Sequence, residues 1–178
     1  MLDRVVFLWI TSHRWSAFDR LMVGLSTIGR GGVVWLALAL VLALARRLSV
    51  RGALTVALAI GLASSTANMA IKPLVRRERP FVRLPQVQLL DKAPRDASFP
   101  SGHSANAFAG AFALSRVASI STAGWPVLCW LLAAAIAYSR VYVGVHYPVD
   151  VIAGALLGVA CGALAVKAAG YRVWASGA

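Results

Sequence analysis

Several apolar runs in the sequence are long enough to cross a bilayer, and they constrain the fold more than any other feature. A helix needs about 20 apolar residues to span the hydrocarbon core. We expect such helices at residues 31–48, 52–71, 101–120, 124–143 and 149–169. Of the 178 residues, 60% are hydrophobic and 13% are charged, and the mean hydropathy is +0.74. This composition excludes a disordered chain, argues against a soluble globule and predicts an all-α integral membrane helix bundle.

Residues 5–28 are also apolar, but His13, Arg14, Asp19 and Arg20 interrupt them. We therefore expect residues 1–30 to form interfacial helices, with a sixth membrane span as the alternative. The predicted bundle thus has five to six transmembrane helices. We expect residues 1–178 to form a single membrane-embedded domain.

The chain carries 18 basic and 6 acidic residues, for a net charge of +12. In a soluble protein this excess would suggest a nucleic-acid partner. Basic residues that flank membrane spans instead contact headgroups and set orientation, so we expect membrane lipids and no nucleic acid as partners. Cys129 and Cys161 lie in apolar runs and are expected to be buried apolar side chains. Glycines recur every fourth residue at 154, 158 and 162, which predicts a close contact between two helices.

Residues 72–101 break the apolar pattern with prolines and charges, and a loop of this length is typically functional or disordered. Just before the loop, Ser64, Asn68 and Lys72 recur every fourth residue and so share one helix face. Polar residues inside a span tend to face the bundle interior or a wet cavity. For Ser64 and Asn68, hydrogen bonds to their own or a neighbouring helix are the alternative.

Polar segments at 72–80, 99–104 and 139–150 should lie on one membrane face if the spans alternate in direction. They contain Lys72, Arg79 and Arg140, which offer one point charge and two planar guanidinium groups. Such donors suit a phosphate that has several equatorial oxygens.

Residues 100–103, Pro-Ser-Gly-His, resemble the beginning of a helix, where Gly102 would let an anion come close to bare backbone amides. His103 follows directly. His146 and Asp150 are four residues apart, a spacing at which a carboxylate can hold an imidazole in one tautomer and make it more nucleophilic.

Other charged residues of the 72–101 loop have two interpretations. They could bind an anionic substrate or anionic lipids, and both remain open for Arg76, Arg77, Arg83, Lys92 and Arg95. Glu78 and Asp96 are expected to pair with these basic residues.

The three polar segments resemble the signature of the type-2 phosphatidic acid phosphatase superfamily, whose blocks are K-x6-RP, PSGH and SR-x5-H-x3-D. Every defined position of this signature is present: Lys72, Arg79, Pro80, Pro100, Ser101, Gly102, His103, Ser139, Arg140, His146 and Asp150. The short chain and the residues around the second block look like small bacterial undecaprenyl-diphosphate phosphatases.

This resemblance implies a phosphatase that needs no metal or cofactor and forms a phosphohistidine. His146 would attack phosphorus, Asp150 would orient His146, and His103 would protonate the leaving oxygen and then activate water. Three cations and two backbone amides would bind the phosphate oxygens: Lys72, Arg79, Arg140, Ser101 and Gly102.

The resemblance favours undecaprenyl diphosphate as the substrate, in cell wall biogenesis. A phosphatidylglycerophosphate, phosphatidate or lipid A phosphatase is the alternative, and a non-catalytic lipid-phosphate binding or transport protein is the alternative from another class. We expect a multi-pass protein of the bacterial cell membrane. More basic residues lie on the catalytic face than on the other, which taken alone favours a cytoplasmic site. We assign these charges to phosphate binding, place the Arg46, Arg47 and Arg51 turn in the cytoplasm, and expect the active site on the outer face.

Overall fold

The protein is helical in the part of the chain that its computed structural model describes, residues 2–120, 122 and 124–173, and this part contains no strand. The all-α prediction is therefore confirmed. The elements are α1 (Leu2–Ser12), α2 (Ser16–Ile28), η1 (Arg30–Gly32), α3 (Val33–Leu44), α4 (Val50–Ser65), η2 (Thr66–Ile71), α5 (Lys72–Val75), α6 (Pro80–Arg83), α7 (Gly102–Val117), α8 (Gly124–Tyr142) and α9 (Pro148–Ala168).

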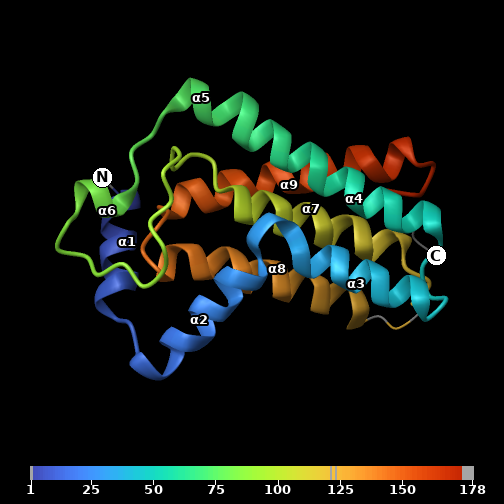
Figure 1. Cartoon of the computed structure of the whole chain (residues 1–178), viewed down its shortest axis with the longest axis horizontal. Coiled ribbons are helices and arrows are strands. Elements are labelled where there is room, and N and C mark those ends of the chain that lie inside the picture. The colour runs from blue at the N-terminus through green and yellow to red at the C-terminus, as the bar shows by residue number, and fades with distance from the viewer. Residues whose placement is uncertain (1, 121, 123, 174–178) are drawn as a thin grey trace.

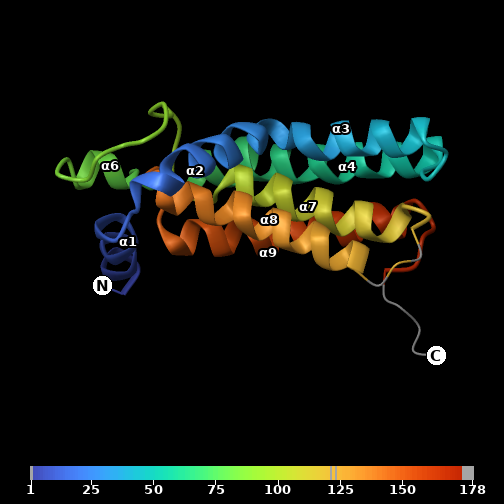
Figure 2. The same ribbon diagram turned by 90° about the horizontal axis from the view of Figure 1, so that it is seen from below.

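Helices α3, α4, α7, α8 and α9 run side by side along the long axis of the molecule (Figures 1 and 2). Helix α7 lies in the middle and packs against α9, α8, α4 and α3. Alanines such as Ala105, Ala109 and Ala113 are fully buried on it, and their small side chains let the neighbouring helices come close. Helices α1 and α6 and the loop before α7 gather at the end of the bundle where α7 and α9 begin (Figure 1).

Three helical stretches are long and apolar enough to cross a membrane among the described residues: Val50–Arg83, Gly124–Tyr142 and Pro148–Ala168. Ser16–Ile28 and Arg30–Leu44 would form a fourth span if this pair, which is bent by 55°, is counted as one. An integral membrane protein is thus supported. The count of five to six spans and the interfacial placement of residues 1–30 stay predictions.

Two expected helices are shorter in the structure. The helix expected at 31–48 is α3, which begins after Gly31 and Gly32, both with positive φ, and ends before Arg46, which also has positive φ. Left-handed backbone at these positions interrupts the helix. The helix expected at 101–120 is α7, which has 16 residues.

The predicted glycine stripe is the contact between α9 and α7. A Cβ atom on Gly154 would lie 2.4 Å from the carbonyl oxygen of Ser101, and one on Gly158 would lie 2.3 Å from that of Ala105. Side chains at these positions would collide with the α7 backbone. The stripe therefore sets the distance between the two helices, as expected.

A Gly158→Ala variant should lower the thermal unfolding midpoint in detergent, because overpacking a tight contact costs about 1–3 kcal/mol. The matched control is Gly61→Ala in α4, where an added Cβ would meet nothing within 4 Å. We expect the control to unfold at or slightly above the wild-type temperature, since alanine is the better helix former. Equal midpoints for the two variants would contradict this role of the stripe.

Candidate active site

The three polar segments meet at the end of the bundle where α7 and α9 begin, as the sequence predicted. They surround a cavity of about 190 Å³. Six of the eight predicted site residues line it: Lys72, Arg79, Gly102, His103, Arg140 and His146. Ser101 and Asp150 lie directly behind, with no exposed surface. The predicted constellation is therefore assembled in one place.

His146 and Asp150 form a buried pair at the start of α9. Their Nδ1 and Oδ2 atoms are 3.6 Å apart. The same Oδ2 accepts hydrogen bonds from the Ser98 hydroxyl at 2.5 Å and from the Tyr147 backbone amide at 2.9 Å. The second bond belongs to the capping box that begins α9 after Tyr147. The local helix start thus fixes the carboxylate that faces the imidazole.

The charge state of His146 suits a nucleophile. Burial lowers the pKa of this histidine to about 4; Arg79 and Arg140 act in the same direction, while Asp150 opposes them. The Arg79 Nη1 atom lies 3.2 Å from His146 Nε2. The imidazole is therefore neutral at neutral pH and retains the nitrogen lone pair that an attack requires.

Helix α7 brings Ser101, Gly102 and His103 to the cavity. Ser101 is the N-cap residue, and its hydroxyl accepts a hydrogen bond from the Ser104 amide at 3.4 Å. The Ser101 amide donates to the carbonyl of Asp150 at 2.9 Å, which ties the beginning of α7 to that of α9. The expectation that this amide binds an anion is therefore wrong, because its N–H already has an acceptor. The Nε2 atom of His103 is buried without a hydrogen-bond partner among the described residues.

Asp96 pairs with different basic residues from those expected. Its carboxylate pairs with Lys72 and, at 2.8 Å, with Arg79 Nη2, rather than with the other basic residues of the loop. Partial burial alone would raise the pKa of Asp96, but hydrogen bonds and charges from Lys72 and Arg79 lower it to about 2. The expectation failed because the loop folds back over the cavity, a tertiary contact that local sequence does not specify. Glu78 pairs with Arg83 at 2.6 Å, as predicted.

Arg140 is bound by two residues that sequence reasoning missed. Its Nη1 atom lies 3.0 Å from Asp91 Oδ2 and contacts the hydroxyl of Ser26 in α2. Ser26 also donates to Asp91 at 2.5 Å. The carboxylates of Asp91 and Asp96, both from the loop before α7, thus pair with all three predicted phosphate-binding cations, and because Lys72 and Arg79 share Asp96, one positive charge is left over.

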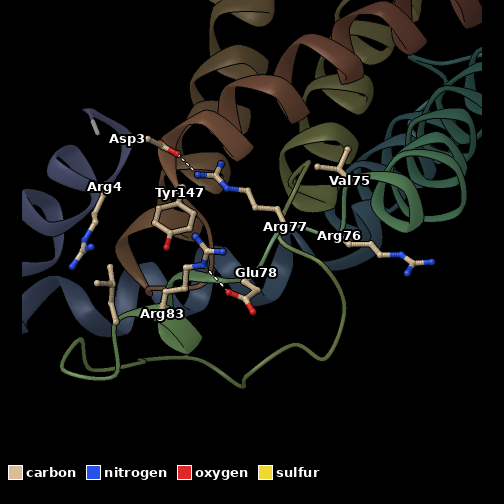
Figure 3. A pocket seen from close by; sticks show the side chains of 9 residues that line it. Asp3, Arg4, Val75, Arg76, Arg77, Glu78, Arg83 and Tyr147 are labelled. Atoms are coloured by element: carbon tan, nitrogen blue, oxygen red, sulfur yellow. Dashed lines mark hydrogen bonds and ion pairs between the residues drawn. The ribbon is translucent and has the colours of Figure 1, made fainter.

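Arg77 is another residue whose role the sequence did not reveal. The sequence analysis left open whether it binds an anionic substrate or anionic lipids. Its guanidinium lies 2.6 Å from Asp150 Oδ1 and 2.5 Å from Asp3 Oδ2, and it stacks over the Tyr147 ring at 4.3 Å. Figure 3 shows it reaching toward Asp3 past Tyr147, in a pocket of about 580 Å³ beside α1. Arg76 points away from this group in the same view. No sequence pattern distinguishes Arg77 from Arg76, because only the fold places one of them against Asp150.

Comparisons with known proteins agree with this geometry. The family model of the PAP2 superfamily matches residues 52–174. An undecaprenyl-diphosphatase of Sulfolobus acidocaldarius is 35% identical over 160 residues, which cover 86% of this chain and 71% of that protein. A decaprenylphosphoryl-5-phosphoribose phosphatase of Mycobacterium tuberculosis is 36% identical over 151 residues, which cover 84% and 79%. The crystal structure of Aquifex aeolicus LpxE matches with a TM-score of 0.80 and 32% identity, covering 94% of this chain and 96% of that one. The chain therefore belongs to the PAP2 superfamily, the family that its three polar segments resemble.

Proposed function

We propose that the protein hydrolyses undecaprenyl diphosphate to undecaprenyl phosphate and inorganic phosphate, without a metal or cofactor. The observation that carries the proposal is the neutral, buried His146, backed by Asp150 and facing a cavity lined with cations. A lipid phosphatase agrees with membership of the PAP2 superfamily. The diphosphate substrate draws support from the 35% identical relative whose name is undecaprenyl-diphosphatase.

In the proposed reaction, His146 forms a bond to the terminal phosphorus while the bond from that phosphorus to the bridging oxygen breaks. His103 takes up a proton when the negatively charged substrate binds beside it and donates that proton to the bridging oxygen, and undecaprenyl phosphate leaves. Water then attacks the phosphohistidine, His103 accepts its proton, and inorganic phosphate is released. Asp150 keeps the imidazole oriented and stabilises the positive charge that develops on it.

The transferred phosphoryl group is held by charge and by geometry. Lys72, Arg79, Arg140 and the backbone amide of Gly102 would bind its three outer oxygens, since phosphoryl transfer depends mainly on positioning and charge stabilisation. Asp91 and Asp96 now bind these cations, so the incoming phosphate displaces two carboxylates.

We place the cavity on the outer face of the cell membrane. The connection with Arg46 and Arg47 joins α3 to α4 at the opposite end of the bundle from α1 and the loop over the cavity (Figure 1). A tight basic turn between two apolar helices favours the cytoplasmic side. The cavity then faces outward.

The proposed reaction predicts phosphate release by the detergent-purified protein in EDTA, faster from undecaprenyl diphosphate than from phosphatidylglycerophosphate or phosphatidate. His146→Ala should abolish release, because it removes the nucleophile. The control His13→Ala alters an exposed histidine that stacks on Trp9 and should retain wild-type rates. Preference for a glycerolipid would instead indicate a role in phospholipid synthesis. Equal rates for wild type and His146→Ala would contradict the mechanism.

We further expect Arg77→Gln to lower kcat by about 10–100-fold with little change in KM, as losses of partners that orient catalytic groups do. Arg77 contacts Asp150 rather than the cavity, so substrate binding should persist. Arg77→Lys should recover part of the rate because it restores the charge. Arg76→Gln, which changes the neighbouring arginine, is the control, and an equal loss of kcat there would contradict the specific role of Arg77.

Removal of the Asp96 charge should strengthen binding of inorganic phosphate, because this carboxylate competes with phosphate for Lys72 and Arg79. We expect the inhibition constant of phosphate to fall by about tenfold or more in Asp96→Asn, since like charges a few ångströms apart repel strongly in a partly buried site. Competitive inhibition assays measure this constant. Glu78→Gln is the control, and an unchanged constant in Asp96→Asn would show that Asp96 does not compete.

A further inference from the structure

Asn106 is a buried polar side chain without a partner. It lies one turn after His103 on α7, lines the cavity and is 3% exposed. Its Oδ1 atom is buried without a hydrogen bond among the described residues, and no bond is made by its amide nitrogen there either. Buried amides are nearly always hydrogen-bonded in native proteins, so an unpaired one beside a cavity indicates a ligand.

Ser64 and Asn68 line the same cavity from the facing helix. The Asn68 amide donates to the Ser64 hydroxyl at 3.2 Å, and its Oδ1 lies 3.2 Å from where a Cβ on Gly102 would be. Asn68 belongs to the π-helical turn η2, a distortion that often marks functional sites. Both expectations for these two residues hold, because they line a cavity and also hydrogen-bond to each other along their own helical stretch. We call Ser64, Asn68 and Asn106 the amide wall.

The amide wall lies farther along the bundle axis from the catalytic end than the phosphate-binding cations do. Helix α4 runs toward the catalytic end and α7 starts there, so Ser64 precedes Lys72 by two turns and Asn106 follows Ser101 by more than one. A lipid substrate has its tail in the membrane, and its leaving group lies on the tail side of the reacting phosphorus. The leaving group therefore lies beyond His103, beside the amide wall.

We propose that the amide wall is a subsite for the leaving phosphate of a lipid diphosphate and makes the enzyme prefer diphosphates to monophosphates of the same lipid. This inference rests on the proposed function. When His146 bonds to the terminal phosphorus, the electron pair of the broken bond passes to the bridging oxygen, and His103 supplies the proton. The leaving lipid phosphate carries outer oxygens that accept hydrogen bonds from amides and a hydroxyl. The leaving alcohol of a monophosphate has only apolar methylenes in that place.

Neutral donors suit this role better than cations would. The outgoing lipid phosphate must leave the site, and additional positive charges beside it would hold it there. Amide N–H groups and a hydroxyl favour the oxygens of the leaving group at lower cost in release. A neutral side chain also suits Asn106, which is buried, because an unpaired charge there would be costly.

Farnesyl diphosphate and farnesyl monophosphate test the proposal, because they share one tail and differ only in the second phosphate. The measured quantity is the ratio of their kcat/KM values. Asn106→Leu should lower this ratio by about tenfold, since an enzyme that hydrogen-bonds a group discriminates strongly by that bond. Asn106→Asp should lower it further, because its carboxylate repels the leaving phosphate.

Thr55→Val is the matched control, a buried α4 hydroxyl bonded to the carbonyl of Arg51, and it should preserve the ratio. Retained turnover of the monophosphate shows that the Asn106 variants fold. A preserved ratio in a working Asn106→Leu enzyme, or an equal fall for both substrates, would overturn the amide-wall proposal alone. Absence of phosphate release from every substrate by the wild type would overturn the proposed function itself.

Discussion

The contact between α7 and α9 is the constraint on which the site depends. Glycines on α9 bring its backbone against that of α7, and the Ser101 amide donates to the carbonyl of Asp150 where the two helices begin. Helix α7 carries His103 and the Gly102 amide proposed to bind phosphate, while α9 and the turn before it carry Asp150 and His146. Backbone contact sets their relative position more rigidly than side chains could, and the proposed in-line reaction requires such rigidity.

Charge pairing explains how so many cations can lie at one end of an apolar bundle. Unpaired buried charges are costly, and each cation of the site has a carboxylate partner. Asp96 binds Lys72 and Arg79, Asp91 binds Arg140, and these acids come from one loop. Arg77 joins Asp150 to Asp3, so α1 is tied to the centre of the proposed chemistry. Of these ion pairs, only those of Asp91 and Asp96 with the three cations would be replaced by a bound phosphate.

The sequence predicted the fold class and the convergence of the polar segments because both follow from local patterns. Long apolar runs specify helices, and Lys72, His103 and His146 lie at helix ends that alternation places together. The partners Asp3, Ser26, Asp91 and Asp96 could not be predicted. They lie 17 to 114 residues from the lysine or arginine that each binds, and their position depends on how the loop and the N-terminal helices fold over the cavity. The shortened α3 had a local signal in Gly31 and Gly32, but glycine alone does not reveal left-handed backbone.

The outward face of the bundle is independent of the contact that positions the site. Large apolar side chains such as Leu40, Leu54, Leu131 and Leu156 are exposed on α3, α4, α8 and α9, away from the glycine stripe. Substitutions among them change what the lipid chains touch without moving His103 relative to His146. The exposed apolar surface can therefore change in evolution, or be redesigned, while the reacting groups keep their spacing. A fold of this kind can adapt its surface to membranes of different composition and retain the same chemistry.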